Sequence, residues 1–443
     1  MMIRRLISKR QLHVVSRSKT NIKPASPTPL QLKHYHLPFH DRMMSDVYNP
    51  IIFFYPNPQP LAENTTISNL LKKSLSKTLS KYYPFAGRLS PSGSHVECND
   101  EGVQFFEAQI SCKLSEMLRK PPVREEEEGF GHLFPRDSIW RHMIYSLMFV
   151  QLSQFSCGGI AIAVGLSHRV ADATTLFSFL LYWANLSCTS NFENGLIHLQ
   201  PCFVNKLLPG SCHNNFVPNF SLYPQKHWIT KEIVFPNSKI AELKAKLQMN
   251  DKLEGVIRDR SYTRTELLTA LLYRCAGLAA VASNSGDYPK SVMLQTVNMR
   301  PLLDPPLPKT SVGNLFTYNH IPTSTTSELQ LSPLVGRMKN GLMQLRGVES
   351  LEGKEIMVLI EKYAKSGHRK YIMSSICNMP LYEGMDFGWG RPVRANVVDA
   401  PFVNCMYLTD SPGKDGITAT VSLEEQDMKN FLLDKELLTY ACL

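Results

Sequence analysis

The chain has 443 residues, too many for one compact core, so two domains are expected. Its formal net charge of +10 favours an anionic partner, although the same charge could serve solubility alone. No dense block of lysine and arginine is interleaved with aromatic residues, which argues against a nucleic-acid partner. The ten cysteines are scattered singly, without zinc-finger spacing, and indicate reduced thiols in a cytoplasmic protein.

Two segments bear on targeting. Residues 1–40 contain no acidic side chain and begin with a cluster of arginines and lysines. Such a segment is typical of a transit peptide or of a short basic extension, and its short amphipathic stretch favours the extension. The most apolar stretch, 143–166, is interrupted by polar residues and glycines, so no membrane span is expected.

The first half alternates strand and helix patterns after a proline-punctuated entry. Alternating hydrophobicity on both sides of 100–102 predicts a hairpin there. The other expected elements are a strand at 51–56, an amphipathic helix at 69–82, a solvated charged loop at 124–128, strands at 145–155 and 160–166, and a helix at 173–186.

Periodicity is lost over 193–224, where prolines accumulate. We therefore expect one domain over 1–205, a crossover linker over 206–225 and a second domain over 226–443. The second half is expected to contain strands at 228–235, 292–299, 402–410 and 417–423, helices at 238–248 and 261–279, a mostly helical stretch at 332–366 and a short final helix. Alternating strands and helices predict an α/β (mixed α+β) fold.

The stretch LSHRVADATT (166–175) places His168 at the end of a buried strand, with Asp172 four residues later at the N-cap of a helix. A neutral imidazole held on such a rigid edge can accept a proton from a hydroxyl or amine near neutral pH. Asp172 could orient the ring, or it could only cap the helix. In a chain with 13 histidines the spacing also arises without function, as in HLPFH (36–40), so the residues alone leave both interpretations open.

Several further motifs accompany this pair. HRVAD (168–172) is followed more than two hundred residues later by DFGWG (386–390). These two stretches match the HxxxD motif and the second signature of the plant BAHD acyltransferases, and the chain resembles that family, in particular its clade of alkaloid acetyltransferases, from about Val14 to its end. The other matching stretches are IKPASPTP (22–29), IIFFYPNP (51–58), YPFAGRL (83–89), VNMR (297–300), DPPLP (304–308) and VGN (312–314).

The resemblance implies two domains like chloramphenicol acetyltransferase, with a solvent channel at their interface. It implies direct transfer of an acyl group, with acetyl expected, from acyl-CoA to a hydroxyl of a specialised metabolite such as an alkaloid. His168 would be the general base, acyl-CoA would be a co-substrate, and neither a metal nor a permanently bound cofactor would take part. A monomer is expected.

The resemblance also assigns supporting residues. Asp172 would point away from the substrates and pair with Arg300, while Asp386 and Gly388 would shape the CoA side of the channel. The helix start at Thr263, with Arg264 beside it, could hold a CoA phosphate, or it could be a plain capped surface helix.

One stretch departs from the family pattern. SSICN (374–378) carries Ile376 and Asn378 where many members have tryptophan and arginine. Isoleucine has no side-chain donor, and the loss of one oxyanion donor can cost about a hundredfold in rate. A catalytically impaired relative that binds CoA or a metabolite without turnover is therefore the alternative function.

Overall fold

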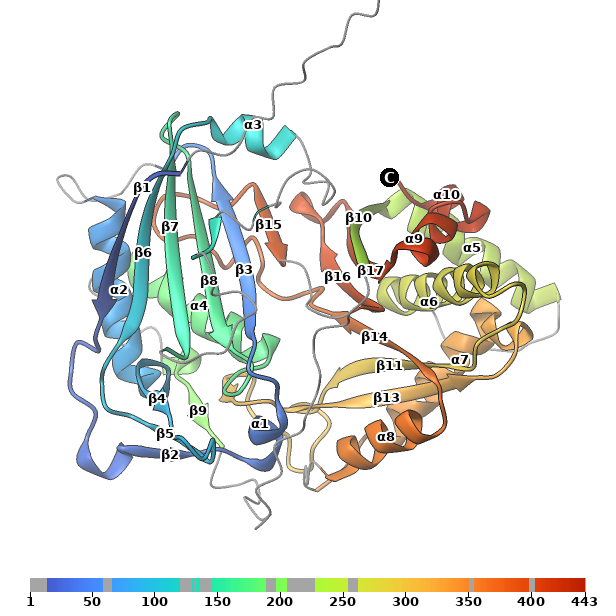
Figure 1. The fold of residues 1–443 in the computed structure, drawn as a ribbon, viewed down its shortest axis with the longest axis horizontal. Coiled ribbons are helices and arrows are strands. Elements are labelled where there is room, and N and C mark those ends of the chain that lie inside the picture. The colour runs from blue at the N-terminus through green and yellow to red at the C-terminus, as the bar shows by residue number, and fades with distance from the viewer. Residues whose placement is uncertain are drawn as a thin grey trace, which may run out of the picture.

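The computed structural model describes most of the chain, namely residues 14–58, 66–119, 130, 133–135, 146–188, 197–204, 228–253, 262–349, 354–397 and 403–442. The basic extension before residue 14, the charged loop at 124–128 and the linker at 206–225 lie outside these ranges. In the described residues two six-stranded sheets form the centres of two halves (Figure 1).

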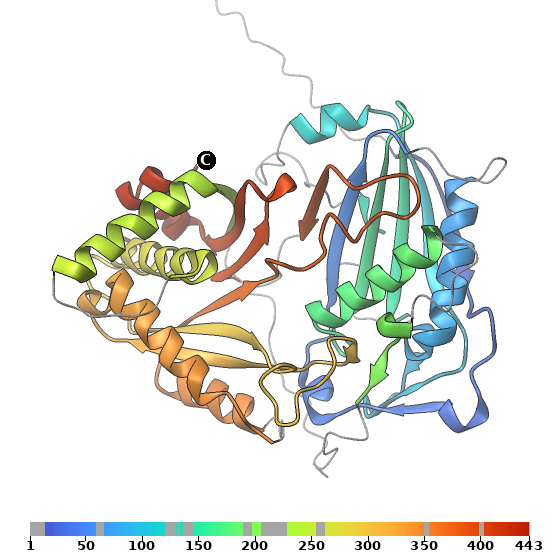
Figure 2. The same cartoon turned by 180° about the vertical axis from the view of Figure 1, so that it is seen from behind.

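The sheet of the first half carries helices on one face (Figures 1 and 2). Its strand order is β1 (Val14–Ile22), β6 (Val103–Ile110), β7 (Met148–Phe155), β8 (Ile160–Ser167), β3 (Tyr48–Tyr55) and β15 (Arg394–Val397). Helices α2 (Ile67–Lys81) and α4 (Ala173–Cys188) bury their apolar stripes against it. β8 is buried along its whole length, as its continuous apolar sequence predicts.

The smaller elements of this half lie at one end of the sheet (Figure 1). They are η1 (Leu30–Leu32), β2 (His34–His36), α1 (Phe39–Met43), η2 (Tyr83–Ala86), β4 (Arg88–Leu89), β5 (His95–Glu97) and β9 (Cys202–Phe203), with α3 (Leu114–Arg119) at the other end. The predicted hairpin around 100–102 is wrong, because β5 pairs with β2 and β4 whereas β6 pairs with β1 and β7. Asp100 accepts hydrogen bonds from Thr28 and Lys33, which ties the connection to the N-terminal segment instead.

The sheet of the second half lies between helices on both faces. Its strand order is β10 (Trp228–Pro236), β17 (Gly416–Glu424), β16 (Cys405–Asp410), β14 (Arg369–Ser375), β11 (Ser291–Asn298) and β13 (Phe316–Thr323). The helices that share its larger core are α5 (Asn237–Leu253), α6 (Arg264–Ser283), α7 (Leu331–Gln344), α9 (Glu425–Phe431) and α10 (Lys435–Tyr440). Met293 of β11 points into that core, while Val292 and Leu294 point to the opposite face, against α8 (Lys354–Lys365).

The remaining short elements of this half are β12 (Ser311–Val312), η5 (Thr326–Leu329) and η6 (Pro412–Lys414). Helix α6 has the length and hydropathy of a membrane-spanning segment, but 67% of its apolar window is buried inside the protein. It is therefore the central helix of the second core. The apolar stretch at 143–166 supplies β7 and β8, which are paired antiparallel strands.

Each half contributes a segment of chain that packs on the other half. Between β14 and β16 the chain leaves the second sheet, crosses to the first, and adds β15 antiparallel to β3 before it returns (Figure 2). Tyr382, Met385 and Phe387 belong to the first core, where Phe387 meets the Trp183 ring edge-on at 5.0 Å. The prediction that all of 226–443 forms the second domain is thus wrong for this excursion, because its large apolar side chains are buried against the first sheet. Neither β14 nor β15 was predicted.

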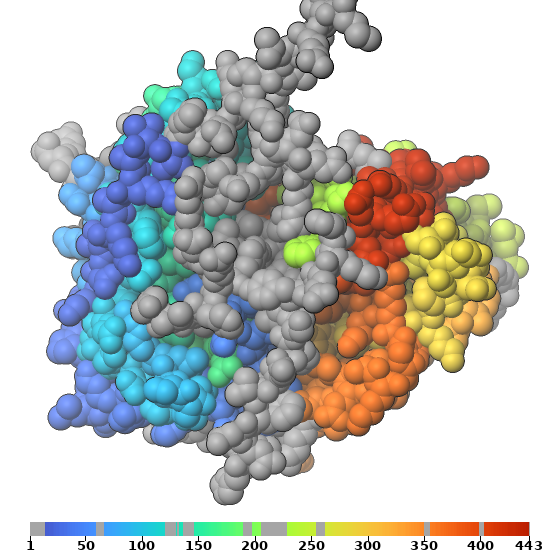
Figure 3. Space-filling view, viewed as in Figure 1, coloured from blue at the N-terminus to red at the C-terminus, as the bar shows by residue number. Residues whose placement is uncertain are grey.

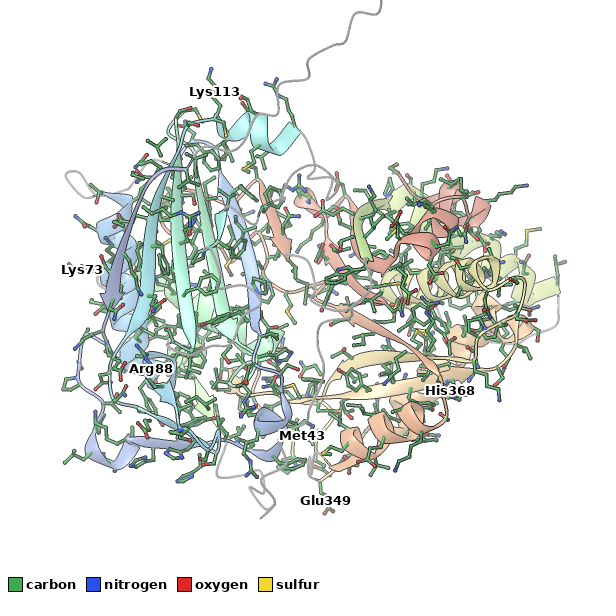
Figure 4. All side chains as sticks on the ribbon, viewed as in Figure 1. Met43, Lys73, Arg88, Lys113, Glu349 and His368 are labelled. Carbon is green, nitrogen blue, oxygen red and sulfur yellow. The ribbon has the colours of Figure 1, made fainter. Side chains whose placement is uncertain are left out.

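In the opposite direction, the segment between β11 and β13 reaches the first half, where β12 pairs with β9. Figure 3 shows the two halves side by side. Met43 of α1 lies where they meet (Figure 4), in an apolar cluster with Phe316 of β13. His168, which follows the end of β8, therefore lies beside segments of both halves.

Candidate active site

His168 follows β8 directly, in a turn that is held on both sides. Its backbone N–H donates to the Val47 carbonyl oxygen at 2.8 Å, and its own carbonyl oxygen accepts from Asn314 Nδ2 at 2.6 Å. The imidazole is only partly exposed, and its ring centroid lies 6.1 Å from that of Phe316. The turn thus presents one imidazole at the junction of the two halves.

The electrostatics of His168 favour a neutral ring. Burial lowers the pKa of the imidazole below its usual value, while its own carbonyl oxygen, Asp172 and Asn314 act in the opposite direction with less effect. Nδ1 is shielded from solvent and makes no hydrogen bond within the described residues. Nε2 is therefore the nitrogen that can meet a substrate, and near pH 7 it is free to accept a proton.

Asp172 makes the predicted pair with Arg300. Arg300 Nη1 donates to Asp172 Oδ2 at 2.7 Å and Nη2 donates to Oδ1 at 3.1 Å, both groups being buried. The carboxylate also accepts the backbone N–H of Thr175 at 2.8 Å, which confirms the predicted helix cap, and that of Leu315 at 3.1 Å. Its oxygens are fully used by these donors, so Asp172 is no proton relay for His168.

The charge of Asp172 is stabilised by the same partners. Burial alone would raise the pKa of this carboxyl, but Arg300 and the two backbone donors outweigh burial and the net pKa lies below its ordinary value. Arg300 also donates to the carbonyl oxygens of Ser311 and Gly313. The ion pair therefore fastens the second half to the HxxxD turn of the first.

Two residues of this site were not singled out from the sequence. Asn314 follows Gly313, whose φ of 128° suits glycine, and it is buried. Asp41 of α1 is buried too, and its Oδ1 accepts from the Asn314 backbone N–H at 2.7 Å and from Asn314 Nδ2 at 2.8 Å. The available signal was the VGN motif, to which no role was assigned, whereas Asp41 lies between the polar residues His40 and Arg42 and has no distinctive local pattern.

The DFGWG segment is an aspartate-stabilised turn. Asp386 Oδ1 accepts the backbone N–H groups of Gly388 at 2.8 Å and Gly390 at 2.9 Å, and both glycines have positive φ. Trp389 stacks on Phe387 with centroids 5.8 Å apart. Within the described residues, these contacts hold the turn to the first core, and its predicted place beside CoA stays a prediction.

The helix start at Thr263 has the predicted cap. Thr263 Oγ1 accepts from the Glu266 backbone N–H, and Glu266 Oε2 accepts from that of Thr263, which completes a capping box. Arg264 donates to Asn237 Oδ1 at 2.8 Å and to Asp410 Oδ1 at 3.3 Å. The guanidinium thus has protein partners, and a phosphate would have to share it with them.

The structure places the unusual SSICN stretch at the end of β14. The Ile376 side chain is buried in the first core, and its backbone N–H donates to the Leu408 carbonyl oxygen at 2.9 Å. The Asn378 backbone has a φ of 66° and donates to Asp410 Oδ2 at 2.6 Å. Neither the side chain nor the backbone N–H of Ile376 is thus free to stabilise an oxyanion.

In the described ranges, no group of three or more His, Cys, Asp or Glu side chains is arranged to hold a metal ion. The nine cysteines within the same ranges are free thiols.

Comparison with known proteins identifies the class to which this fold and site belong. The family model described as "Transferase family" matches residues 12–438, and the chain belongs to that family, the BAHD acyltransferases. It is an acyltransferase. The fold class predicted from the sequence is confirmed.

Individual relatives add detail. The crystal structure of vinorine synthase superposes with a TM-score of 0.81 at 30% identity, covering 97% of this chain and 98% of that one. The chain is 35% identical to a 17,18-epoxy-17-hydroxycur-19-ene N-malonyltransferase of Strychnos nux-vomica, over 98% of this chain and 91% of the relative. It is 33% identical to deacetylvindoline O-acetyltransferase of Catharanthus roseus, over 96% of both chains.

Proposed function

We propose that this protein transfers an acyl group, most simply acetyl, from acyl-CoA to a hydroxyl of an alkaloid-like metabolite, with His168 as general base. The observation that carries the proposal is the state of His168. Its ring is kept neutral by burial, its Nδ1 is shielded, and it stands where the two halves meet. The activities for which the relatives are named support an alkaloid acceptor, but one relative transfers malonyl to nitrogen and the other transfers acetyl to oxygen.

The reaction follows from one base and two substrates. Nε2 of His168 takes the proton of the acceptor hydroxyl as the oxygen attacks the thioester carbonyl carbon. The tetrahedral intermediate carries a negative oxygen, and its collapse breaks the carbon–sulfur bond. The CoA thiolate leaves and recovers the proton from the imidazolium, so His168 returns to its neutral form. Asp172 stays ionised throughout the reaction, because its carboxylate is paired with Arg300.

The position of the CoA phosphates is a second part of the proposal. Arg264 is partly exposed at the start of α6, and its two protein partners leave donor capacity on a five-donor guanidinium. Arg264→Gln should raise KM for acetyl-CoA more than KM for a short pantetheine thioester that lacks the nucleotide. Equal changes for both donors would remove Arg264 from the phosphate site.

The experiment is release of free CoA thiol from acetyl-CoA and malonyl-CoA with pooled alkaloid alcohols and amines. We expect acceptor-dependent release that falls by about a hundredfold or more in His168→Ala, since general-base catalysis contributes about 10²–10⁴. His320→Ala is the matched control, because His320 lies on β13 and its ring hydrogen-bonds the Tyr363 hydroxyl of α8. Equal activity of His168→Ala and His320→Ala would contradict the proposal.

The second candidate is a relative that binds CoA without turnover, and the buried, donor-free Ile376 favours it. Calorimetric CoA binding by folded protein, with no release for any donor, would select this candidate.

A further inference from the structure

The orientation of the Asn314 amide is fixed by two acceptors. Nδ2 donates to Asp41 Oδ1 at 2.8 Å and to the His168 carbonyl oxygen at 2.6 Å. A carboxylate oxygen and a backbone carbonyl can only accept, so the nitrogen of the amide must lie on their side and Oδ1 must point elsewhere. Both hydrogens of Nδ2 are thereby used.

The remaining polar atoms of the two side chains are a possible acceptor and a possible donor for one hydrogen bond. Asn314 Oδ1 and His168 Nδ1 are both shielded from solvent, and neither makes a hydrogen bond within the described residues. Asn314 acts to raise the pKa of the His168 ring, which is the direction expected of an acceptor, and Oδ1 is its one uncommitted polar side-chain atom. A hydrogen bond from Nδ1–H to this oxygen would favour the tautomer with hydrogen on Nδ1, which leaves the Nε2 lone pair free.

The residue that sequence spacing offers for this task cannot perform it. Both oxygens of Asp172 are taken by Arg300 and by the backbone donors of Thr175 and Leu315. Within the described residues the imidazole therefore has no carboxylate partner, and Asn314 is the side chain of the second half that donates to the His168 backbone.

We propose that Asn314 is a positioning residue for the base: it holds the His168 turn and selects the Nδ1–H tautomer, while Asp41 fixes the orientation of its amide. This inference rests on the proposed role of His168. Asp41 acts as an acceptor from α1, reaching across to the second half of the chain. The base is thus assembled from both halves, since Asn314 comes from the segment between β12 and β13.

The kinetic test compares two buried asparagines. Asn314→Ala should lower kcat by about 10- to 100-fold, a part of the general-base contribution, and change KM for either substrate by less than about threefold. The matched control is Asn319→Ala on β13, because Asn319 is also buried and its Nδ2 donates to the Met338 carbonyl oxygen at 2.8 Å. It should lose stability but not kcat. Equal kcat losses in both variants would overturn the inference.

Asp41 gives a test by rescue. Asp41→Ala removes the acceptor that orients Asn314 and should lower kcat by about tenfold. Asp41→Asn keeps a carbonyl oxygen at that place and should restore most of the loss. If both variants lose kcat equally, orientation of the amide is not what Asp41 supplies, and the inference fails.

The tautomer can be observed directly. In protein labelled with ¹⁵N-histidine, the difference from the His168→Ala spectrum isolates the His168 ring, and its two nitrogen shifts report the tautomer. We expect Nδ1–H in the intact protein and a mixture with Nε2–H in Asn314→Ala. An Nε2–H ring in the intact protein would overturn the inference. An active His168→Ala would instead contradict the proposed function, so the two failures are distinguishable.

Discussion

Two buried carboxylates, Asp172 and Asp41, lie on either side of the 313–315 segment, and their surroundings shift their pKa values in opposite directions. Asp172 is paired with Arg300 and accepts two backbone donors, and its pKa lies below the ordinary value. Asp41 receives only Asn314, on one oxygen, while Oδ2 is buried without a hydrogen bond in the described residues. Burial raises the pKa of Asp41 to about 7, and the Asn314 donors only partly offset it.

The contrast separates two uses of a buried acid. Asp172 holds a charge that Arg300 compensates, so it fastens the two halves and gives the base no acceptor. Asp41 has no cation in hydrogen-bond contact within the described residues, and its useful property is an oxygen that accepts two donors from Asn314. The Asp172 carboxylate therefore joins the two halves, whereas the Asp41 carboxylate orients Asn314 at a cost in stability.

The largest expected effect follows from leaving Asp172 without its cation. Arg300→Met should lower the free energy of unfolding by about 3–5 kcal/mol, because a buried charge is left unpaired. Urea unfolding at pH 7 measures this. The double variant Asp172→Asn/Arg300→Met should recover part of the loss, since no charge remains buried.

The control is a pair exposed to solvent. Lys429 lies 2.7 Å from Glu425 at the surface of α9, so Lys429→Met should change stability by less than about 1 kcal/mol. If Arg300→Met is as stable as Lys429→Met, Asp172 is not the assembly anchor described above.

The raised pKa of Asp41 leads to a second prediction: removing its charge should increase stability, and the increase should depend on pH. Its pKa is 3.8 in the reference state and about 7 when folded, so the unfolded chain gives up the proton first. The contribution of Asp41 to stability is therefore complete below about pH 4, falls as the pH rises from 4 to 7, and is constant above that range. Asp172 adds to the upward shift and Arg300 opposes it.

Asp41→Asn removes this penalty. We expect it to match the natural protein at pH 4 and to exceed it at pH 8 by about 1–3 kcal/mol, less than the full shift implies because Asn accepts more weakly. Thermal unfolding at a series of pH values measures the difference. A variant that is less stable at pH 8 would mean that Asp41 is ionised and compensated, like Asp172.

The sequence carried the parts of this site that depend on local pattern. The strand end before His168 and the helix caps at Asp172 and Thr263 follow from neighbouring residues, and the structure has all three. The Asp172–Arg300 pair came from the family resemblance and is present. Such features are fixed by backbone geometry within one turn, or by a motif that a family shares.

The rest depends on partners that no local pattern encodes. Asp41 and Asn314 are 273 positions apart, and their contact exists because α1 and the β12–β13 connection meet at the end of β8. β15 is four residues long and was not predicted, since its place is set by the free edge of β3 in the other half. The 100–102 hairpin failed for the same reason, because Asp100 is held by residues from the N-terminal segment.

The smallest expected effect concerns the DFGWG turn. It tests whether an accepting oxygen, without a negative charge, is sufficient to stabilise a turn outside the buried Asp41–Asn314 contacts. Asp386 Oδ1, like Asp41 Oδ1, accepts two N–H donors, but its turn is partly exposed. Asp386→Asn should therefore change the free energy of unfolding by less than about 0.5 kcal/mol at any pH, whereas Asp386→Ala should lower it by about 1–2 kcal/mol. Unfolding of both variants at pH 6 and pH 8 measures this. A loss in Asp386→Asn as large as in Asp386→Ala would show that the charge, and not the acceptor, stabilises the DFGWG turn, and would place Asp386 with Asp172 instead of with Asp41.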